Sequence, residues 1–248
     1  MTPDRRRGLR RGAAVASWCA GTGLLRSSLA SPPGSRDFYA GTAGVAGIWV
    51  AGAGLTAPGR REGGGLRHPV GTPLAIAGGS FVAFYAAALV ARRIPPLESA
   101  IRRVLAHAVE GDTRLVLVTT LATGVGEELF FRGAWYDTLG GRHPVLSSTI
   151  SHATSTAATG NPALTLASVA MGGLFGLERR ASGGVVAPAI THATWSALMV
   201  RFVTPLFAEP TPAVTPGAGR SRAAGSRAGA RSRRRSGRRS PRARGTSA

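Results

Sequence analysis

Residues 126–132 read Gly126-Glu127-Glu128-Leu129-Phe130-Phe131-Arg132, and they close an uncharged run that begins at Leu115. On a helix, Glu128 and Arg132 are four residues apart and share a face, so they can form an ion pair. Glu127 lies about 100° further round the same helix and has no such partner in its own segment. Charged side chains inside an apolar span are costly and usually mark function. We therefore expect Glu127 to be a functional residue.

Long apolar runs on both sides of this stretch predict an all-α, polytopic transmembrane bundle. Runs of about 20 residues are long enough to cross a bilayer. The 35-residue run from His143 to Leu177 is broken at Gly160-Asn161-Pro162, which predicts two spans in place of one. The predicted spans are 38–59, 69–91, 115–139, 144–159, 162–177 and 181–200. A soluble helical protein rich in Ala and Gly is the alternative, but it does not account for so many uncharged runs.

Small and hydroxylated residues predict where these helices touch. Ser and Thr crowd the run 144–159, and Gly172 and Gly176 are four residues apart, a spacing that lets helices approach closely in lipid. Residues 97–114 mix charged and apolar residues and predict an amphipathic surface helix. Residues 178–180, Glu-Arg-Arg, are predicted to form a charged loop. Three further histidines are expected to be solvated: His68, His107 and His143.

Both ends of the chain differ from its middle, so we expect three segments, 1–37, 38–207 and 208–248. Residues 5–11 hold five arginines and are followed by the uncharged run 12–25, which fits a signal peptide, an interfacial helix or a short span. Eleven of the 31 basic residues, all arginines, lie between Arg220 and Arg244, and the tail is expected to be disordered. It would attract any polyanion, including lipid headgroups, so no specific nucleic acid is expected. The single cysteine, Cys19, excludes an intramolecular disulfide.

Orientation is predicted from the arginine-rich ends of the spans. With six spans starting at Phe38, both termini and the region 92–114 would be cytoplasmic. The same arrangement places five other arginines on the opposite side of the membrane: Arg60, Arg61, Arg67, Arg179 and Arg180.

The candidate chemistry rests on Glu127, His152 and His192, which fall on three different spans. A carboxylate and two imidazoles that meet in an apolar bundle can activate water and then protonate a leaving amine. They can also bind a divalent metal such as zinc, although the spacing is not that of the His-Glu-x-x-His signature. A lone histidine on an apolar helix is more often a packing residue. We expect Glu128 and Arg132 to be a structural ion pair.

These residues resemble a known family. Glu127, Glu128, Arg132 and Gly133 form Glu-Glu-x-x-x-Arg-Gly, which is similar to the first motif of the CPBP intramembrane proteases, the CAAX-protease and bacteriocin-processing family, also called Abi. His152 matches the histidine that ends the family's Phe-x-x-x-His motif. Residues 172–192 resemble the segment that leads into His-x-x-x-Asn. The resemblance covers about residues 115–200.

The resemblance implies a helical bundle that encloses a polar cavity within the membrane. By this resemblance, Glu127 and His152 would activate water, while His192 and residue 196 would stabilise the oxyanion. The family has been described both as metalloproteases and as metal-free glutamate proteases, so a zinc site at Glu127, His152 and His192 stays open. Its members cleave prenylated CAAX proteins or act in bacteriocin maturation and immunity.

Two positions depart from the family pattern. Ser148 stands where the second motif has Phe, and Ser196 stands where the last motif has Asn. We expect an integral, multi-pass endopeptidase of a bacterial plasma membrane, with a cytoplasmic tail, whose partners are membrane lipid and a membrane-associated protein or peptide substrate. The alternative is a catalytically weak or inactive homologue that serves as an immunity or scaffold protein, and Ser196 bears on this choice.

Overall fold

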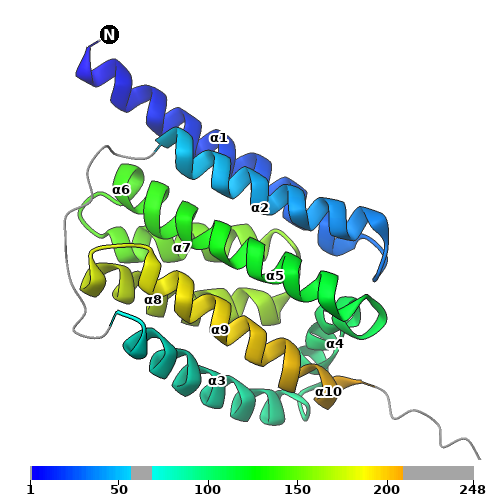
Figure 1. Ribbon diagram of the computed structural model, residues 1–248. Coiled ribbons are helices and arrows are strands. Elements are labelled where there is room, and N and C mark those ends of the chain that lie inside the picture. Colours follow the sequence, from blue (N-terminus) through cyan, green and yellow to red (C-terminus); the bar gives the residue numbers. More distant parts are fainter. Residues whose placement is uncertain (1, 57–68, 209–248) are drawn as a thin grey trace, which may run out of the picture. The chain divides into compact units, whose positions relative to one another are not determined.

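The computed structural model describes residues 2–56 and 69–208, which are all-helical and contain no strand. They belong to one compact unit that ends at Ala208. The predicted linker 60–69 lies almost wholly outside the described residues, as do His68 and the predicted disordered tail beyond Ala208. In chain order the helices are α1 (Pro3–Ala30), α2 (Arg36–Thr56), α3 (Gly71–Ala91), α4 (Pro95–Glu110), α5 (Thr113–Glu127), the π-helix η1 (Glu128–Trp135), α6 (Tyr136–Leu139), α7 (Pro144–Ala157), α8 (Pro162–Ser182), α9 (Val186–Phe202) and α10 (Thr204–Phe207). In Figure 1 the long helices α1, α2, α5, α9 and α3 run roughly parallel, and α4 lies near one end of them.

Local sequence signals explain most helix ends. Asn161 caps α8, because its side-chain oxygen accepts from the backbone N–H groups of Ala163 and Leu164 at 3.0 and 3.1 Å. Gly183, with φ of 69°, ends the same helix in the left-handed conformation that favours glycine. The predicted charged loop at 178–180 is therefore wrong. These residues form the last turns of α8, where Arg179 and Arg180 sit favourably at the negative end of the helix dipole.

Two of the described helices are long and apolar enough to cross a membrane by length and composition. They are α2 and α3, with mean hydropathies of 1.3 and 2.0. The helices α5, α7 and α9 are shorter, with 15, 14 and 17 residues. The all-α prediction is confirmed, and the full set of six spans stays a prediction.

Helix α1 packs antiparallel against α2. Gly21 lies against the Trp49 ring, and Gly52 lies against Ser17. The indole of Trp18 also donates to the Ser151 carbonyl on α7 at 3.0 Å, so α1 is an integral part of the bundle. As a result, the first residues of α1 and the end of α10 lie at opposite ends of the bundle (Figure 1). The expectation that both termini lie on the cytoplasmic side stays a prediction, and α1 adds a helix along the bundle that the six predicted spans did not include.

The core beside the candidate site is aromatic. Val45, Trp49, Phe130, Phe131 and Ala134 form one buried cluster between α2 and η1. The rings of Trp49 and Phe130 stack with their centroids 4.7 Å apart. This cluster fixes η1 against α2, so it sets the position of the residues on the opposite face of η1.

Helix α4 is amphipathic as predicted, but the expected solvation of His107 is wrong. Its side chain is 5% exposed and stacks on Phe38, with the ring centroids 4.0 Å apart and the planes 15° apart. Burial lowers the pKa of His107, because it penalises the charged form. His143, in contrast, is exposed as expected.

Candidate active site

Three helices bring Glu127, His152 and His192 together. Glu127 ends α5, His152 lies on α7 and His192 lies on α9. Glu127 Oε2 is 3.5 Å from His152 Nε2 and 3.9 Å from His192 Nε2. The three side chains are 6–12% exposed, so they form a nearly buried cluster inside the bundle.

The neighbouring carboxylate, Glu128, has different partners. Its Oε1 atom is 3.3 Å from Arg132 Nη1 and 2.9 Å from His192 Nδ1. The side chains of Glu128 and Arg132 are both fully buried, at 0% exposed. The i, i+4 spacing correctly predicted this ion pair. The sequence did not predict that Glu128 also binds His192, which lies 64 residues away.

Arg132 joins the ion pair to two further elements. Its Nη1 atom is 3.2 Å from His152 Nδ1, and its Nη2 atom donates to the Gly172 carbonyl at 3.0 Å. Its guanidinium also lies over the Phe175 ring, 5.4 Å from the centroid. Gly172 leaves room for this guanidinium, because a Cβ at position 172 would be only 3.1 Å from Arg132 Nη2. One buried cation therefore holds η1, α7 and α8 together behind the two histidines.

These contacts assign opposite tautomers to the two histidines. A guanidinium only donates hydrogen bonds, so His152 Nδ1 accepts from Arg132 and the ring proton sits on Nε2, facing Glu127. A carboxylate only accepts, so His192 Nδ1 donates to Glu128 and Nε2 is left with its lone pair facing the site. Arg132 therefore fixes the tautomer of His152, and Glu128 fixes the tautomer of His192.

The site is built on a π-helical segment, which no sequence pattern predicted. Its i→i+5 hydrogen bonds widen the turn, a feature that is frequent at functional sites. In η1 the buried residues are spread over a wide arc: Glu128, Phe130, Phe131, Arg132 and Ala134. As a result, one short segment buries both the Glu128–Arg132 ion pair and the aromatic residues that pack on α2.

Aromatic rings and a glycine hold the imidazoles in place. Phe131 stacks on His152 and Phe175 stacks on His192, each with centroids 4.7 Å apart. A Cβ on Gly124 would lie 3.3 Å from the His192 ring, so glycine allows this ring to approach α5. Thr191 ties the start of α9 to α8, because its hydroxyl is 2.6 Å from Glu178 Oε1.

The two serines at departing positions are both buried. Ser148 is 0% exposed, and its hydroxyl bonds the Val145 carbonyl of its own helix, which is consistent with a packing role. Ser196 lies one turn beyond His192 on α9 and is 6% exposed. Within the described residues its hydroxyl forms no hydrogen bond with Glu127, His152 or His192.

The hydrogen bonds at the site do not fit the zinc set predicted from Glu127, His152 and His192. A metal ligand needs the lone pair of the imidazole nitrogen, and the Nε2 atom of His152 carries the ring proton because Arg132 occupies Nδ1. Across residues 2–56 and 69–208, no group of three His, Cys, Asp or Glu side chains has the geometry to hold a metal ion.

Comparison with known proteins finds one family match. Residues 110–198 match the family model described as type II CAAX prenyl endopeptidase Rce1-like. The match contains every residue of the cluster and confirms the resemblance found in the motifs. No curated protein and no solved structure matches the chain.

Proposed function

We propose that the protein is an intramembrane endopeptidase that hydrolyses a peptide bond with a water activated by Glu127, since residues 110–198 match the family model of the Rce1-like type II CAAX prenyl endopeptidases. The observation that carries this proposal is the contrast between the two adjacent carboxylates. Glu127 is 12% exposed and faces both histidines, whereas Glu128 is sealed at 0% and serves the ion pair. Only Glu127 can reach a water and a substrate carbonyl together.

In the proposed reaction His152 orients the base. Its Nε2–H faces Glu127 Oε2, which leaves the other oxygen of that carboxylate to take a proton from water. The resulting hydroxide attacks the carbonyl carbon of the scissile bond. Glu127 then passes this proton to the leaving amide nitrogen, the carbon–nitrogen bond breaks, and an acid and an amine are released.

His192 would stabilise the oxyanion. Its Nδ1 atom donates to Glu128, so the ring is held with Nε2 toward the site, where a proton on Nε2 would act as a donor; in His152 it is Nδ1 that faces Arg132. An Nε2–H of His192 could then donate to the negative charge that develops on the substrate oxygen.

The substrate class proposed is a membrane-associated protein or peptide. The family takes its description from CAAX prenyl proteins, and the chain supplies at least two helices apolar enough for a bilayer. A substrate anchored in the same membrane would bring its scissile bond to a site enclosed by helices. The proposed mechanism uses only side chains of the protein, so we expect cleavage of the substrate to persist when chelators remove divalent metal ions.

The test is cleavage of a membrane-anchored reporter peptide in proteoliposomes. Glu127→Gln keeps the size of the side chain and one accepting oxygen for His152 but removes its basicity, so turnover should fall by about 10²–10⁴. Glu110→Gln, an exposed acid at the end of α4, is the matched control and should keep wild-type turnover. Full activity of Glu127→Gln would reject the assignment. A wild-type protein that cleaves no reporter from a broad peptide library would favour the inactive-homologue alternative.

A further inference from the structure

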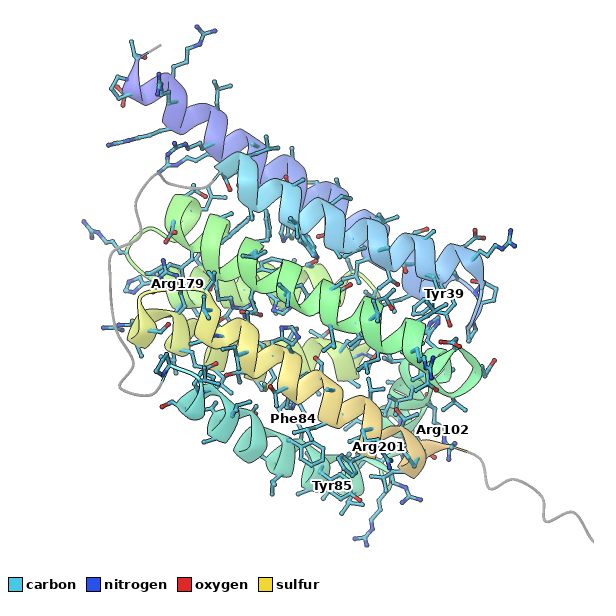
Figure 2. The ribbon with its side chains drawn as sticks, viewed as in Figure 1. Tyr39, Phe84, Tyr85, Arg102, Arg179 and Arg201 are labelled. Atoms are coloured by element: carbon cyan, nitrogen blue, oxygen red, sulfur yellow. The ribbon has the colours of Figure 1, made fainter. Side chains whose placement is uncertain are left out.

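A cavity of about 510 Å³ lies at the end of the bundle where α6, α7 and α8 meet, and none of the five charged or imidazole side chains of the site lines it. Tyr136, Arg142, His143 and Arg180 line one part of it, and apolar residues line the rest. Arg179, the neighbour of Arg180, lies toward the end of the bundle opposite to Arg102 and Arg201 (Figure 2). The cavity therefore opens near one end of the helices, where a membrane protein meets the headgroup region.

The two arginines of this cavity are not neutralised by the protein. Arg179 forms an ion pair with Asp137 at 3.0 Å and donates to the Arg132 carbonyl at 2.9 Å. Arg142 and Arg180, in contrast, are exposed and have no ion pair with any carboxylate of the described residues. Two unpaired guanidinium groups beside a hydroxyl form a ready binding site for a phosphate group.

Exposed apolar residues continue from this cavity along the α7–α8 pair. On α7 they are Leu146 (58% exposed) and Ile150 (55%), which share a face because they are four residues apart. On α8 they are Leu177 (56%), Val169 (51%) and Leu166 (59%). The two helices are in direct contact, with Gly176 packed on Val145.

The length of this apolar face matches one leaflet. Leu177 and Leu166 are 11 residues apart, or about 16 Å along the helix at 1.5 Å per residue. Half of a typical hydrocarbon core is about 15 Å. We propose that the cavity binds the phosphate headgroup of an anionic phospholipid, whose acyl chains lie along the exposed face of α7 and α8. Thr149 connects this site to the interior, because it lines the cavity and packs on Gly172, the residue that accepts from Arg132.

The experiment measures lipid binding to the full-length protein by native mass spectrometry. The probe lipids are phosphatidylglycerol and phosphatidylcholine of equal chain length, together with a dihexanoyl phosphatidylglycerol and inorganic phosphate. The wild type should retain one phosphatidylglycerol at least tenfold more tightly than phosphatidylcholine, and the short-chain lipid should bind more weakly. Equal retention of the two long-chain lipids would overturn the proposal. So would inorganic phosphate that competes as well as the lipid, because it would define a site for free phosphate.

Charge-matched variants separate the cavity from the arginine-rich tail. Arg142→Gln with Arg180→Gln should lower the affinity of the retained phosphatidylglycerol about tenfold or more, which is the loss of roughly 1.4 kcal/mol. Arg238→Gln with Arg239→Gln removes the same charge from the tail and should leave the retained lipid unchanged. Equal losses in both double variants would show nonspecific attraction and reject the site. Unchanged chromatographic behaviour of the Arg142→Gln/Arg180→Gln variant in detergent checks that it is folded. The lipid test measures binding and not cleavage, so its result does not depend on the outcome of the Glu127→Gln experiment.

Discussion

Glu127 and Glu128 are neighbours of one residue type, yet the bundle gives them different surroundings. Glu128 lies among a guanidinium and an imidazole in a fully sealed position, while Glu127 keeps a small exposed surface between two histidines. The i, i+4 rule was sufficient to predict the Glu128–Arg132 pair. No spacing rule links Glu128 to His192 or Arg132 to His152, because those contacts depend on how separate helices pack.

Substitutions at His192 and Ser196 test the proposed oxyanion site. His192→Ala should lose about 10²–10³ in turnover, the usual effect of removing a preorganised donor. Ser196→Ala should cost less than His192→Ala, and Ser196→Asn should raise turnover or leave it unchanged, because an amide donor reaches one atom farther. The measurement is the cleavage rate of one reporter in proteoliposomes. Near wild-type turnover of His192→Ala would mean that the three-helix site is wrong.

The second prediction concerns the buried cation. Arg132→Ala leaves Glu128 unpaired and removes the donors to His152 and Gly172, so the folded protein should be destabilised by about 3–5 kcal/mol and its abundance in membranes should fall. Arg114→Ala is the control, because Arg114 is exposed on α5. The readout is the amount of monodisperse protein extracted by detergent. An Arg132→Ala variant as abundant as the control would show that the ion pair is dispensable for folding.

Among the elements, the helices were largely predictable and their internal irregularities were not. Apolar run lengths and the Gly-Asn-Pro break at 160–162 located α7 and α8 within a few residues. The π-helical segment η1 and the burial of His107 both arise from tertiary packing, against α2 in the first case and against Phe38 in the second. Local sequence carries no signal for either. The end of α8 was missed because the charged residues 178–180 were read as a loop, whereas Gly183 supplies the stop.

The close contact between α7 and α8 gives a prediction with a neighbouring control. In Gly172→Ala the new Cβ would lie 3.1 Å from Arg132 Nη2 and 3.2 Å from Thr149 Cγ2, so the arginine must shift. We expect a lower thermal unfolding midpoint in detergent and a reduced turnover. Gly173→Ala adds the same methyl group where nothing lies within 4 Å, and it should match the wild type in both measurements. Identical behaviour of the two variants would show that Arg132 tolerates displacement.

Across the whole molecule, the packed bundle ends at Phe207. This residue is 3% exposed, and its carbonyl accepts from Arg102 Nη1 at 2.6 Å. The orientation expected from charge stays a prediction, because within the described residues arginines gather at both ends of the bundle. Arg11 bonds the Thr138 carbonyl at one end, where Arg179 also lies, while Arg102 and Arg201 lie at the other. The positive-inside rule needs an asymmetry that these ends do not provide.

Removal of the tail tests this boundary. A chain that ends at Ala208 keeps every packed residue of the bundle, so it should insert, purify as a folded species and cleave the reporter at the wild-type rate. Its binding to anionic vesicles should weaken and depend less on salt, since eleven arginines are lost. Vesicle co-sedimentation at two salt concentrations provides the measurement. A truncated chain that cannot be extracted in folded form would contradict the boundary at Ala208.

The bond between Glu128 and His192 spans 64 residues of the chain and has a consequence for biosynthesis. Glu128 and Arg132 leave the ribosome together and can neutralise each other at once as η1 enters the membrane. His192 follows only with α9, the last long helix of the bundle. The proposed site is therefore complete only when synthesis of the described bundle is nearly finished, so a nascent chain that ends before α9 should cleave no reporter peptide.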